Sequence, residues 1–142
     1  MLIELGTATL LVLATVLIHG VGLGVIGKLL GHEIEQETHE HLPPLSFRAL
    51  FFTSLVILGL IALHGIEIWG YAFFYLAVGA LHDLRTAVYL STISYSTVGF
   101  DDEGLRQNWQ MVVAIEGING VILLGWSTAF FVMVITRLNR GR

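Results

Sequence analysis

The stretch of sequence that decides the fold is AVYLSTISYSTVGFDD, residues 87–102. It overlaps an apolar run, residues 84–96, that is too short to cross a bilayer, because a spanning helix needs about 20 residues. Backbone that is not helical survives at membrane depth only where protein or a water-filled cavity covers it. The run is therefore predicted to form a re-entrant helix that leads directly into Thr97-Val98-Gly99-Phe100.

The composition is that of an integral membrane protein. Of the 142 residues, 55% are hydrophobic and 13% are charged, whereas soluble domains carry about 25% charged residues. Three apolar stretches, residues 7–30, 49–69 and 109–137, are long enough to span a hydrocarbon layer of about 30 Å. The predicted fold is therefore all-α, with three transmembrane helices and one re-entrant helix. The first stretch starts beside Glu4 without basic residues and is longer than a signal peptide's apolar core, so we expect a retained helix.

The charges and the lack of cysteine exclude two kinds of binding site. The formal net charge is −4, and acidic residues gather at 33–40 and 101–103, a pattern that offers nothing to a nucleic-acid backbone. Cysteine is absent, which excludes disulfides and thiolate metal sites.

Basic residues predict the orientation in the cell membrane, because cytoplasmic loops carry more Lys and Arg than external loops. With the N-terminus outside, Arg85 and Arg106 are external, and five basic residues are cytoplasmic: Lys28, Arg48, Arg137, Arg140 and Arg142. This multi-pass topology puts the C-terminus in the cytoplasm and lets the loop at 83–102 enter from the outer face.

The order of these elements resembles the two-transmembrane, pore-loop potassium channels, a family of bacterial ion-channel pore domains. There a spanning helix, a pore helix, a T-V-G-Y/F selectivity filter and a second spanning helix follow one another, as they do here over residues 49–137. The resemblance divides the chain into an extra N-terminal transmembrane helix (1–31), a cytoplasmic linker (32–48) and a pore domain (49–142). The pore domain then consists of an outer helix, the pore loop at 83–102 and an inner helix.

The resemblance implies a potassium-selective channel that conducts K⁺ passively, and not an enzyme. The implied ion ligands are the Thr97 hydroxyl and four carbonyl oxygens, those of Thr97, Val98, Gly99 and Phe100. Each chain supplies one such strand, and four strands must surround an axis to replace the water shell of K⁺, which implies a homotetramer. The partners are then K⁺ and the lipid bilayer, with no cofactor beyond the permeant ion. Gly99 is expected in a conformation open mainly to glycine.

Asp101 departs from the family's usual T-V-G-Y-G-D, because it stands where the second glycine is found. Four copies of Asp101 and Asp102 around the outer mouth would attract cations and alter the outermost ion site. Two alternatives to a selective channel follow. One is a weakly selective cation channel, and the other is a non-conducting membrane subunit that keeps the pore fold.

Glu116 is a carboxylate inside the third apolar stretch, where ionisable groups are rare and mark function. Three more residues share its helical stripe, which is predicted to face protein or the pore: Asn119, Gly120 and Ser127. His64 is expected as its partner, with Glu67 nearer the surface, so that the three form a modulatory cluster behind the filter. Both pH-dependent conductance and a buried hydrogen-bonded strut are compatible with this cluster. An embedded enzyme is disfavoured, because no nucleophile-base pair or metal-ligand motif accompanies it.

Glycines in two spanning stretches permit either bending or close packing. Gly117, Gly120 and Gly125 either mark a gating bend of the inner helix or let helices approach closely. The segment at 22–27 formally matches a dinucleotide-binding fingerprint, GxGxxG. That fingerprint requires a preceding strand, so helix packing is predicted instead.

Four further features carry expectations. The linker holds His32, His39, His41 and four glutamates without a diagnostic ligand spacing, so it is expected to be solvated and not a metal or pH sensor. Residues 70–75, GYAFFY, suit a membrane-interface anchor. Asp83 is expected to cap the re-entrant helix, whose C-terminal end would attract cations. Three aromatic residues are expected to brace the filter: Tyr89, Tyr95 and Phe100.

Overall fold

The computed structural model describes residues 1–40, 47–99 and 109–140, with side chains for 1–29, 47, 50–99 and 109–136. Four helices occupy these ranges: α1 (Leu2–Glu40), α2 (Phe47–Ala77), α3 (Leu84–Tyr95) and α4 (Gln110–Arg140). Three of them are long and apolar enough to cross a membrane, over Leu2–Leu29, Leu50–Ala77 and Gln110–Thr136. The prediction of three spanning helices and one short helix is confirmed.

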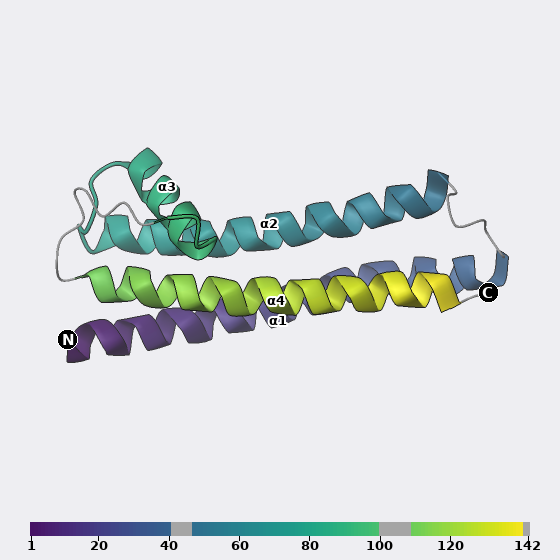
Figure 1. Cartoon of the computed structure of the whole chain (residues 1–142), viewed down its shortest axis with the longest axis horizontal. Helices are drawn as coiled ribbons and strands as arrows, with labels where there is room; N and C mark the ends of the chain where they lie inside the picture. Colours follow the sequence, from purple (N-terminus) through teal and green to yellow (C-terminus); the bar gives the residue numbers. More distant parts are fainter. Residues whose placement is uncertain (41–46, 100–108, 141–142) are drawn as a thin grey trace.

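The three long helices lie alongside one another, and the short helix packs at one end (Figure 1). α1 packs against α4 and α2, and α3 packs against both α2 and α4. α3 starts at the end of the molecule that holds the N-terminus and runs back toward its middle, while α4 ends at the opposite end. The short helix is therefore re-entrant with respect to the long ones.

The long helices extend beyond the predicted boundaries. α1 continues through Glu40 instead of ending near residue 31, and α2 runs from Phe47 to Ala77. Residues 32–40 contain Glu and Gln, which favour helix, and no Gly or Pro, which would break it. The first half of the expected linker is therefore helical, and residues 41–46 lie outside the described ranges.

The aromatic stretch at the end of α2 is not simply an anchor at the membrane interface. Tyr71 and Tyr75 are buried, at 1% and 0% exposure, and their hydroxyls contact α4, whereas Phe73 is 53% exposed. Residues four apart lie on one face of a helix, so the two tyrosines point inward together. The anchoring prediction is wrong for these two residues.

α2 ends in a glycine cap. Gly79 has a φ of 66°, the Ala80 N–H donates to the Tyr75 carbonyl at 2.9 Å, and the Gly79 N–H donates to the Leu76 carbonyl at 3.1 Å. These two bonds define the Schellman motif, in which a left-handed residue, usually glycine, ends the helix. The chain can therefore turn at once toward α3.

Asp83 caps the start of α3, as predicted. Its carboxylate accepts hydrogen bonds from the Thr86 N–H at 2.8 Å and the Thr86 hydroxyl at 2.9 Å. These bonds stabilise the charged form and hold the pKa of Asp83 below its usual value. The cap fixes the exposed start of α3, and the helix enters the apolar core at Ala87.

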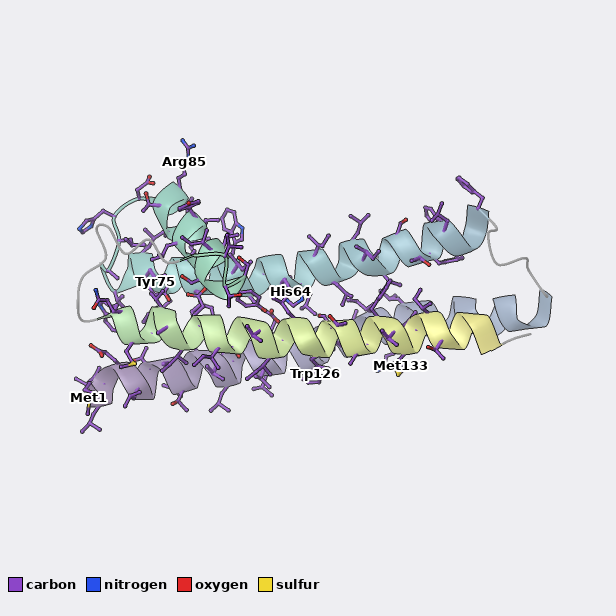
Figure 2. The ribbon with its side chains drawn as sticks, in the orientation of Figure 1. Met1, His64, Tyr75, Arg85, Trp126 and Met133 are labelled. Carbon is purple, nitrogen blue, oxygen red and sulfur yellow. The ribbon has the colours of Figure 1, made fainter. Side chains whose placement is uncertain are left out.

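A layer of polar side chains separates two apolar cores. The core beside α3 contains Ala8, Tyr71, Ala72, Tyr75, Ala80, Leu81, Ala87, Leu90, Val112 and Val113. The core at the other end contains Leu23, Val56, Leu60, Leu63 and Val134. The buried polar residues between them are Thr15, His19, Glu67, Ser91, Ser94, Glu116, Asn119 and Ser127. Figure 2 shows His64 and Tyr75 directed into the bundle and Arg85 directed away from it.

Candidate functional site

α3 ends in the same capping motif as α2, but a threonine takes the position of the glycine. The Val98 N–H donates to the Ile93 carbonyl, and the Thr97 N–H donates to the Ser94 carbonyl, both at 3.1 Å. Thr97 has a φ of 57°, a left-handed conformation that costs a residue with a Cβ about 1–2 kcal/mol. The segment singled out in the sequence is thus tied directly to the end of α3.

Residues 97–99 lie on the surface of the single chain. Thr97, Val98 and Gly99 are all exposed, Val98 to 79%. The positive φ expected at Gly99 is found at Thr97 instead, because the helix cap requires its left-handed residue at that position. Phe100, Asp101 and Asp102 lie outside the described residues.

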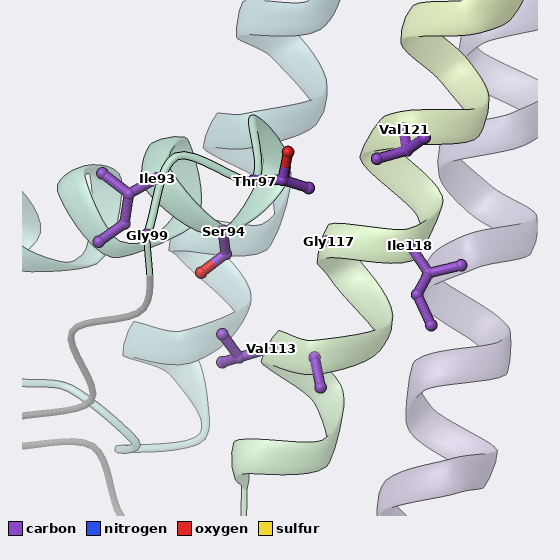
Figure 3. A pocket seen from close by; sticks show the side chains of 9 residues that line it. Ile93, Ser94, Thr97, Gly99, Val113, Gly117, Ile118 and Val121 are labelled. Atoms are coloured by element: carbon purple, nitrogen blue, oxygen red, sulfur yellow. The ribbon is translucent and has the colours of Figure 1, made fainter.

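An open pocket of about 400 Å³ lies between this segment and α4 (Figure 3). Its walls come from α3 and residues 97–99 on one side and from α4 on the other: Ile93, Ser94, Thr97, Gly99, Val113, Ala114, Gly117, Ile118 and Val121. Among the side chains that the structure describes, Ser94 Oγ is a buried oxygen without a hydrogen-bond partner. The pocket is thus a mostly apolar hollow next to the exposed segment.

α4 comes closest to α3 at two glycines. A Cβ at Gly117 would lie 3.1 Å from the Ser94 carbonyl oxygen, and a Cβ at Gly120 would overlap the Tyr95 carbonyl. A Cβ at Gly125 would meet no atom within 4 Å. α4 is one unbroken helix through all three residues, so close packing explains Gly117 and Gly120 in this conformation.

Glycines in α1 also allow close packing. Gly22 faces Leu63 of α2, while Gly20 faces Trp126 of α4. The GxGxxG segment is entirely helical, as the packing interpretation requires.

Glu116 is fully buried, and each of its carboxylate oxygens accepts a hydrogen bond. The Tyr75 hydroxyl donates to Oε2 at 2.6 Å, and the Ser91 hydroxyl donates to Oε1. The predicted partner, His64, is not among these contacts. The prediction is wrong because α3 packs against both α2 and α4 and brings Ser91 to the carboxylate.

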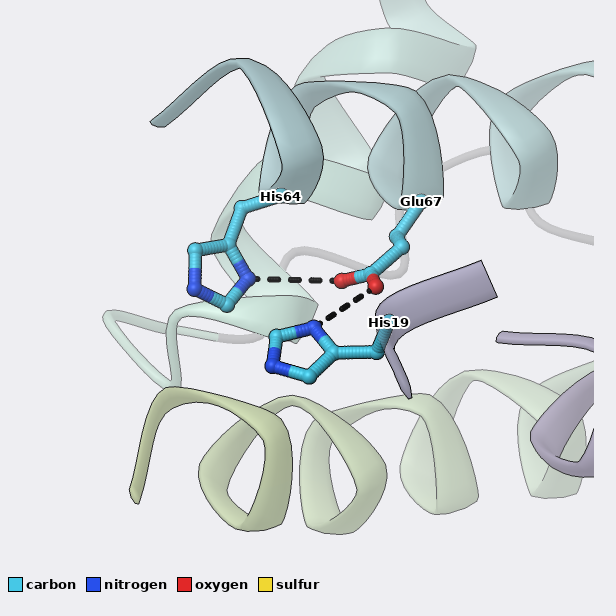
Figure 4. A group of neighbouring side chains, drawn as sticks. All are labelled: His19, His64 and Glu67. Carbon is cyan, nitrogen blue, oxygen red and sulfur yellow. Dashed lines mark hydrogen bonds and ion pairs between the residues drawn. The ribbon is translucent and has the colours of Figure 1, made fainter. Parts of the chain in front are cut away.

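His64 and Glu67 belong to a separate network that reaches α1. Glu67 Oε1 lies 2.9 Å from His19 Nδ1, and Glu67 Oε2 lies 3.3 Å from His64 Nδ1 (Figure 4). The Tyr95 hydroxyl donates to Glu67 Oε2 and lies 2.9 Å from His64 Nδ1. Ser127 Oγ lies 3.3 Å from His19 Nε2 and 3.0 Å from His64 Nε2. Glu67 is 0% exposed.

His19 was missed by sequence reasoning, although a signal for it existed. It is an ionisable residue inside a spanning helix, which is the argument that singled out Glu116. Of the three aromatic residues expected behind the filter, Tyr95 is buried there, Tyr89 is 58% exposed, and Phe100 lies outside the described residues. The predicted polar stripe of α4 is buried, with Glu116 at 0%, Asn119 at 3% and Ser127 at 5% exposure.

A comparison with protein families identifies the arrangement. A family model described as "Ion channel" matches residues 61–137, which include most of α2, all of α3, the segment at 97–99 and α4 as far as Arg137. No curated protein and no solved structure matches the chain significantly. Ion channels pass ions across membranes and are not enzymes. Because the match covers more than half of the 142 residues, this three-span membrane protein belongs to the ion channel family.

Proposed function

We propose that the protein is a potassium-selective channel that conducts K⁺ passively through a homotetrameric pore. The observation that carries the proposal is the exposed segment 97–99, joined directly to the short helix α3 inside the range that the ion channel family matches. The ion ligands are the Thr97 hydroxyl and the carbonyl oxygens of Thr97, Val98, Gly99 and Phe100. Four such strands replace the hydration shell of K⁺.

The position of α3 favours a cation over an anion. The carbonyl end of a helix carries a partial negative charge, and in α3 this end adjoins residues 97–99. The N–H groups of Thr97 and Val98 are already bonded to α3 carbonyls, so they are not free to bind an anion.

The supply of one filter strand per chain supports the proposed tetramer. Residues 97–99 and the pocket beside them are the surface on which neighbouring chains pack around the axis. The N-terminus is outside and the C-terminus is cytoplasmic, which puts residues 83–102 at the outer face. Asp101 and Asp102 then form the outer mouth.

Weakly selective cation conduction is the second candidate, and Asp101 is the observation that favours it. Purified protein in liposomes separates the candidates by K⁺ and Na⁺ flux measured under matched gradients. We expect K⁺ flux to exceed Na⁺ flux. Equal fluxes would favour the weakly selective channel, and no flux of either ion would favour a non-conducting subunit.

Two substitutions test the altered outer site. Asp101→Gly is expected to raise the K⁺/Na⁺ permeability ratio and to weaken block by divalent cations, because it removes the carboxylate ring. Asp83→Asn is the matched control, because it also removes one acidic charge from the pore loop, at the opposite end of α3 from Asp101, and Asn caps a helix as well as Asp does. If Asp101→Gly changes neither quantity, the outer site is not altered by Asp101.

A further inference from the structure

We propose that His19, His64, Glu67 and Tyr95 form a binding site for one transition-metal ion of the zinc class. One ligand atom from each of His19, His64 and Glu67 lies within 4.8 Å of the other two, and the two Nδ1 atoms lie 2.9 Å and 3.3 Å from the Glu67 carboxylate oxygens. Figure 4 shows both rings turning Nδ1 toward the same carboxylate. The site does not depend on which ion the channel conducts.

The donor atoms converge from three helices. His64 and Glu67 are three residues apart on α2 and therefore share a face, while His19 comes from α1 and Tyr95 from the end of α3. Tyr95 Oη lies 2.9 Å from His64 Nδ1 and donates to Glu67, so it adjoins the fourth position of a tetrahedron. Zn²⁺ takes such four-coordinate sets of imidazole and carboxylate ligands.

Proton counting on the two rings favours a cation at this position. Ser127 Oγ contacts Nε2 of both His19 and His64, but a hydroxyl has one proton to donate. If both neutral rings carry their proton on Nδ1, one Nε2 has no donor. If the two rings differ, Ser127 can donate to one Nε2 and accept from the other, but one Nδ1 lone pair is left: that of His19 faces Glu67 Oε1, and that of His64 shares the single Tyr95 hydroxyl proton with Glu67. If both carry it on Nε2, both N–H groups donate to Ser127, and two Nδ1 lone pairs then face a carboxylate that is itself an acceptor. A cation between these atoms satisfies this last arrangement completely.

The arrangement with both protons on Nε2 is also the one that metal sites use. A ligating imidazole donates its other N–H to a neighbouring oxygen, which fixes the tautomer, and here Ser127 Oγ serves both rings. Nitrogen donors favour Zn²⁺, Co²⁺ or Ni²⁺ over Ca²⁺ and Mg²⁺, which prefer oxygen alone. The chain has no cysteine, so no thiolate ligand competes with these donors for the metal ion.

Such an ion joins α1 to the part of the chain that the ion channel family matches. His19 lies outside residues 61–137, whereas the other three donors lie inside that range. Tyr95 is the last residue of α3 and stands two residues before Thr97. A bound metal ion therefore fixes α1 and α2 to the helix end that carries the exposed segment.

The test uses the full chain, purified in detergent and stripped with a chelator. His32, His39 and His41 are first replaced by Asn, so that the histidines of the polar linker cannot bind the probe. Titration with Co²⁺ is expected to give one ion per chain, with the visible absorption of tetrahedral Co²⁺, and Zn²⁺ is expected to displace it. X-ray absorption of the Zn²⁺ form is expected to show two imidazole ligands at about 2.0–2.1 Å.

Variants then assign the ligands. His19→Asn and Glu67→Gln are each expected to weaken Co²⁺ binding by at least about tenfold. His82→Asn is the matched control, because His82 is exposed and outside the cluster. If the variants misfold, the visible spectrum of bound Co²⁺ and the X-ray absorption of bound Zn²⁺, both measured on the chain with an intact cluster, still show whether histidines bind the metal ion. The proposal is overturned if the chain binds neither Co²⁺ nor Zn²⁺, the result expected if an additional proton, and not a metal ion, holds the cluster together. It is also overturned if the His19→Asn variant binds Co²⁺ as tightly as the unsubstituted protein.

Discussion

Thr97 has a left-handed backbone conformation, which a glycine adopts at the corresponding position at the end of α2. Gly79 ends α2 with a φ of 66°, and Thr97 ends α3 with a φ of 57° in the same motif. A strained residue that is retained where glycine would fit points to a use for its side chain. The proposed use is the Thr97 hydroxyl as an ion ligand.

Thr97→Gly is expected to stabilise the protein by up to about 1 kcal/mol, because relief of the left-handed strain exceeds the extra chain entropy of glycine. K⁺ flux should fall at the same time, because the hydroxyl is lost. Thermal unfolding in detergent and liposome flux measure the two effects. Gly79→Thr is the control and should lower stability by about 1–2 kcal/mol. A stability loss in Thr97→Gly would show that Thr97 is unstrained.

Glu116 is expected to act as a hydrogen-bonded strut. Glu116→Gln should be tolerated within about 1 kcal/mol, because the new amide can donate to Ser91, whose hydroxyl also contacts the Ile68 carbonyl at 2.9 Å. Glu116→Ala should cost about 2–4 kcal/mol, because it leaves the buried Tyr75 hydroxyl unpaired and opens a cavity. Thermal unfolding measures both. A changed pH dependence of current in Glu116→Gln would instead favour proton sensing.

At the scale of elements, contact with α4 sets how closely the C-terminal end of α3 approaches the helix bundle. The carbonyl groups of Ser94 and Tyr95 rest on Gly117 and Gly120, where no side chain intervenes. This contact positions residues 97–99, because Thr97 is bonded to the Ser94 carbonyl. Gly117 and Gly120 of α4 therefore help to position the exposed segment.

Gly120→Ala is expected to destabilise the protein by about 1–3 kcal/mol and to reduce ion flux, because its Cβ would overlap backbone that cannot move aside. Gly125→Ala is the matched control on the same helix. Its Cβ meets open space, so it should be neutral or stabilising by up to about 1 kcal/mol. Thermal unfolding and liposome flux measure both variants. Lost conduction in Gly125→Ala with unchanged stability would support a gating bend instead of packing.

At the scale of the molecule, a single chain leaves most of its spanning surface uncovered. The share of each spanning window buried inside the chain is 17%, 22% and 28%. Lipid or other copies of the chain must cover the rest. We propose that the other chains of the tetramer pack against the side that holds residues 97–99.

The tetramer is expected to have four times the chain mass of 15.6 kDa in native mass spectrometry. Because the chain has no cysteine, Val98→Cys tests the axis directly. Oxidation should link neighbouring chains through this exposed position, whereas Phe73→Cys, exposed on α2, should stay unlinked. A monomeric mass, or equal cross-linking at both positions, would argue against four chains around residue 98.

The sequence by itself determined the three spanning helices, the short helix between them, its Asp83 cap and the buried stripe of α4. These features depend on local properties, namely hydrophobicity over one helix length, helical periodicity and capping chemistry. Tertiary structure alone decided which polar groups meet. His19 and Glu67 are 48 residues apart, and Ser91 and Glu116 are 25 apart. Helix packing sets these pairs, because rotation or translation of one helix by part of a turn would exchange every partner.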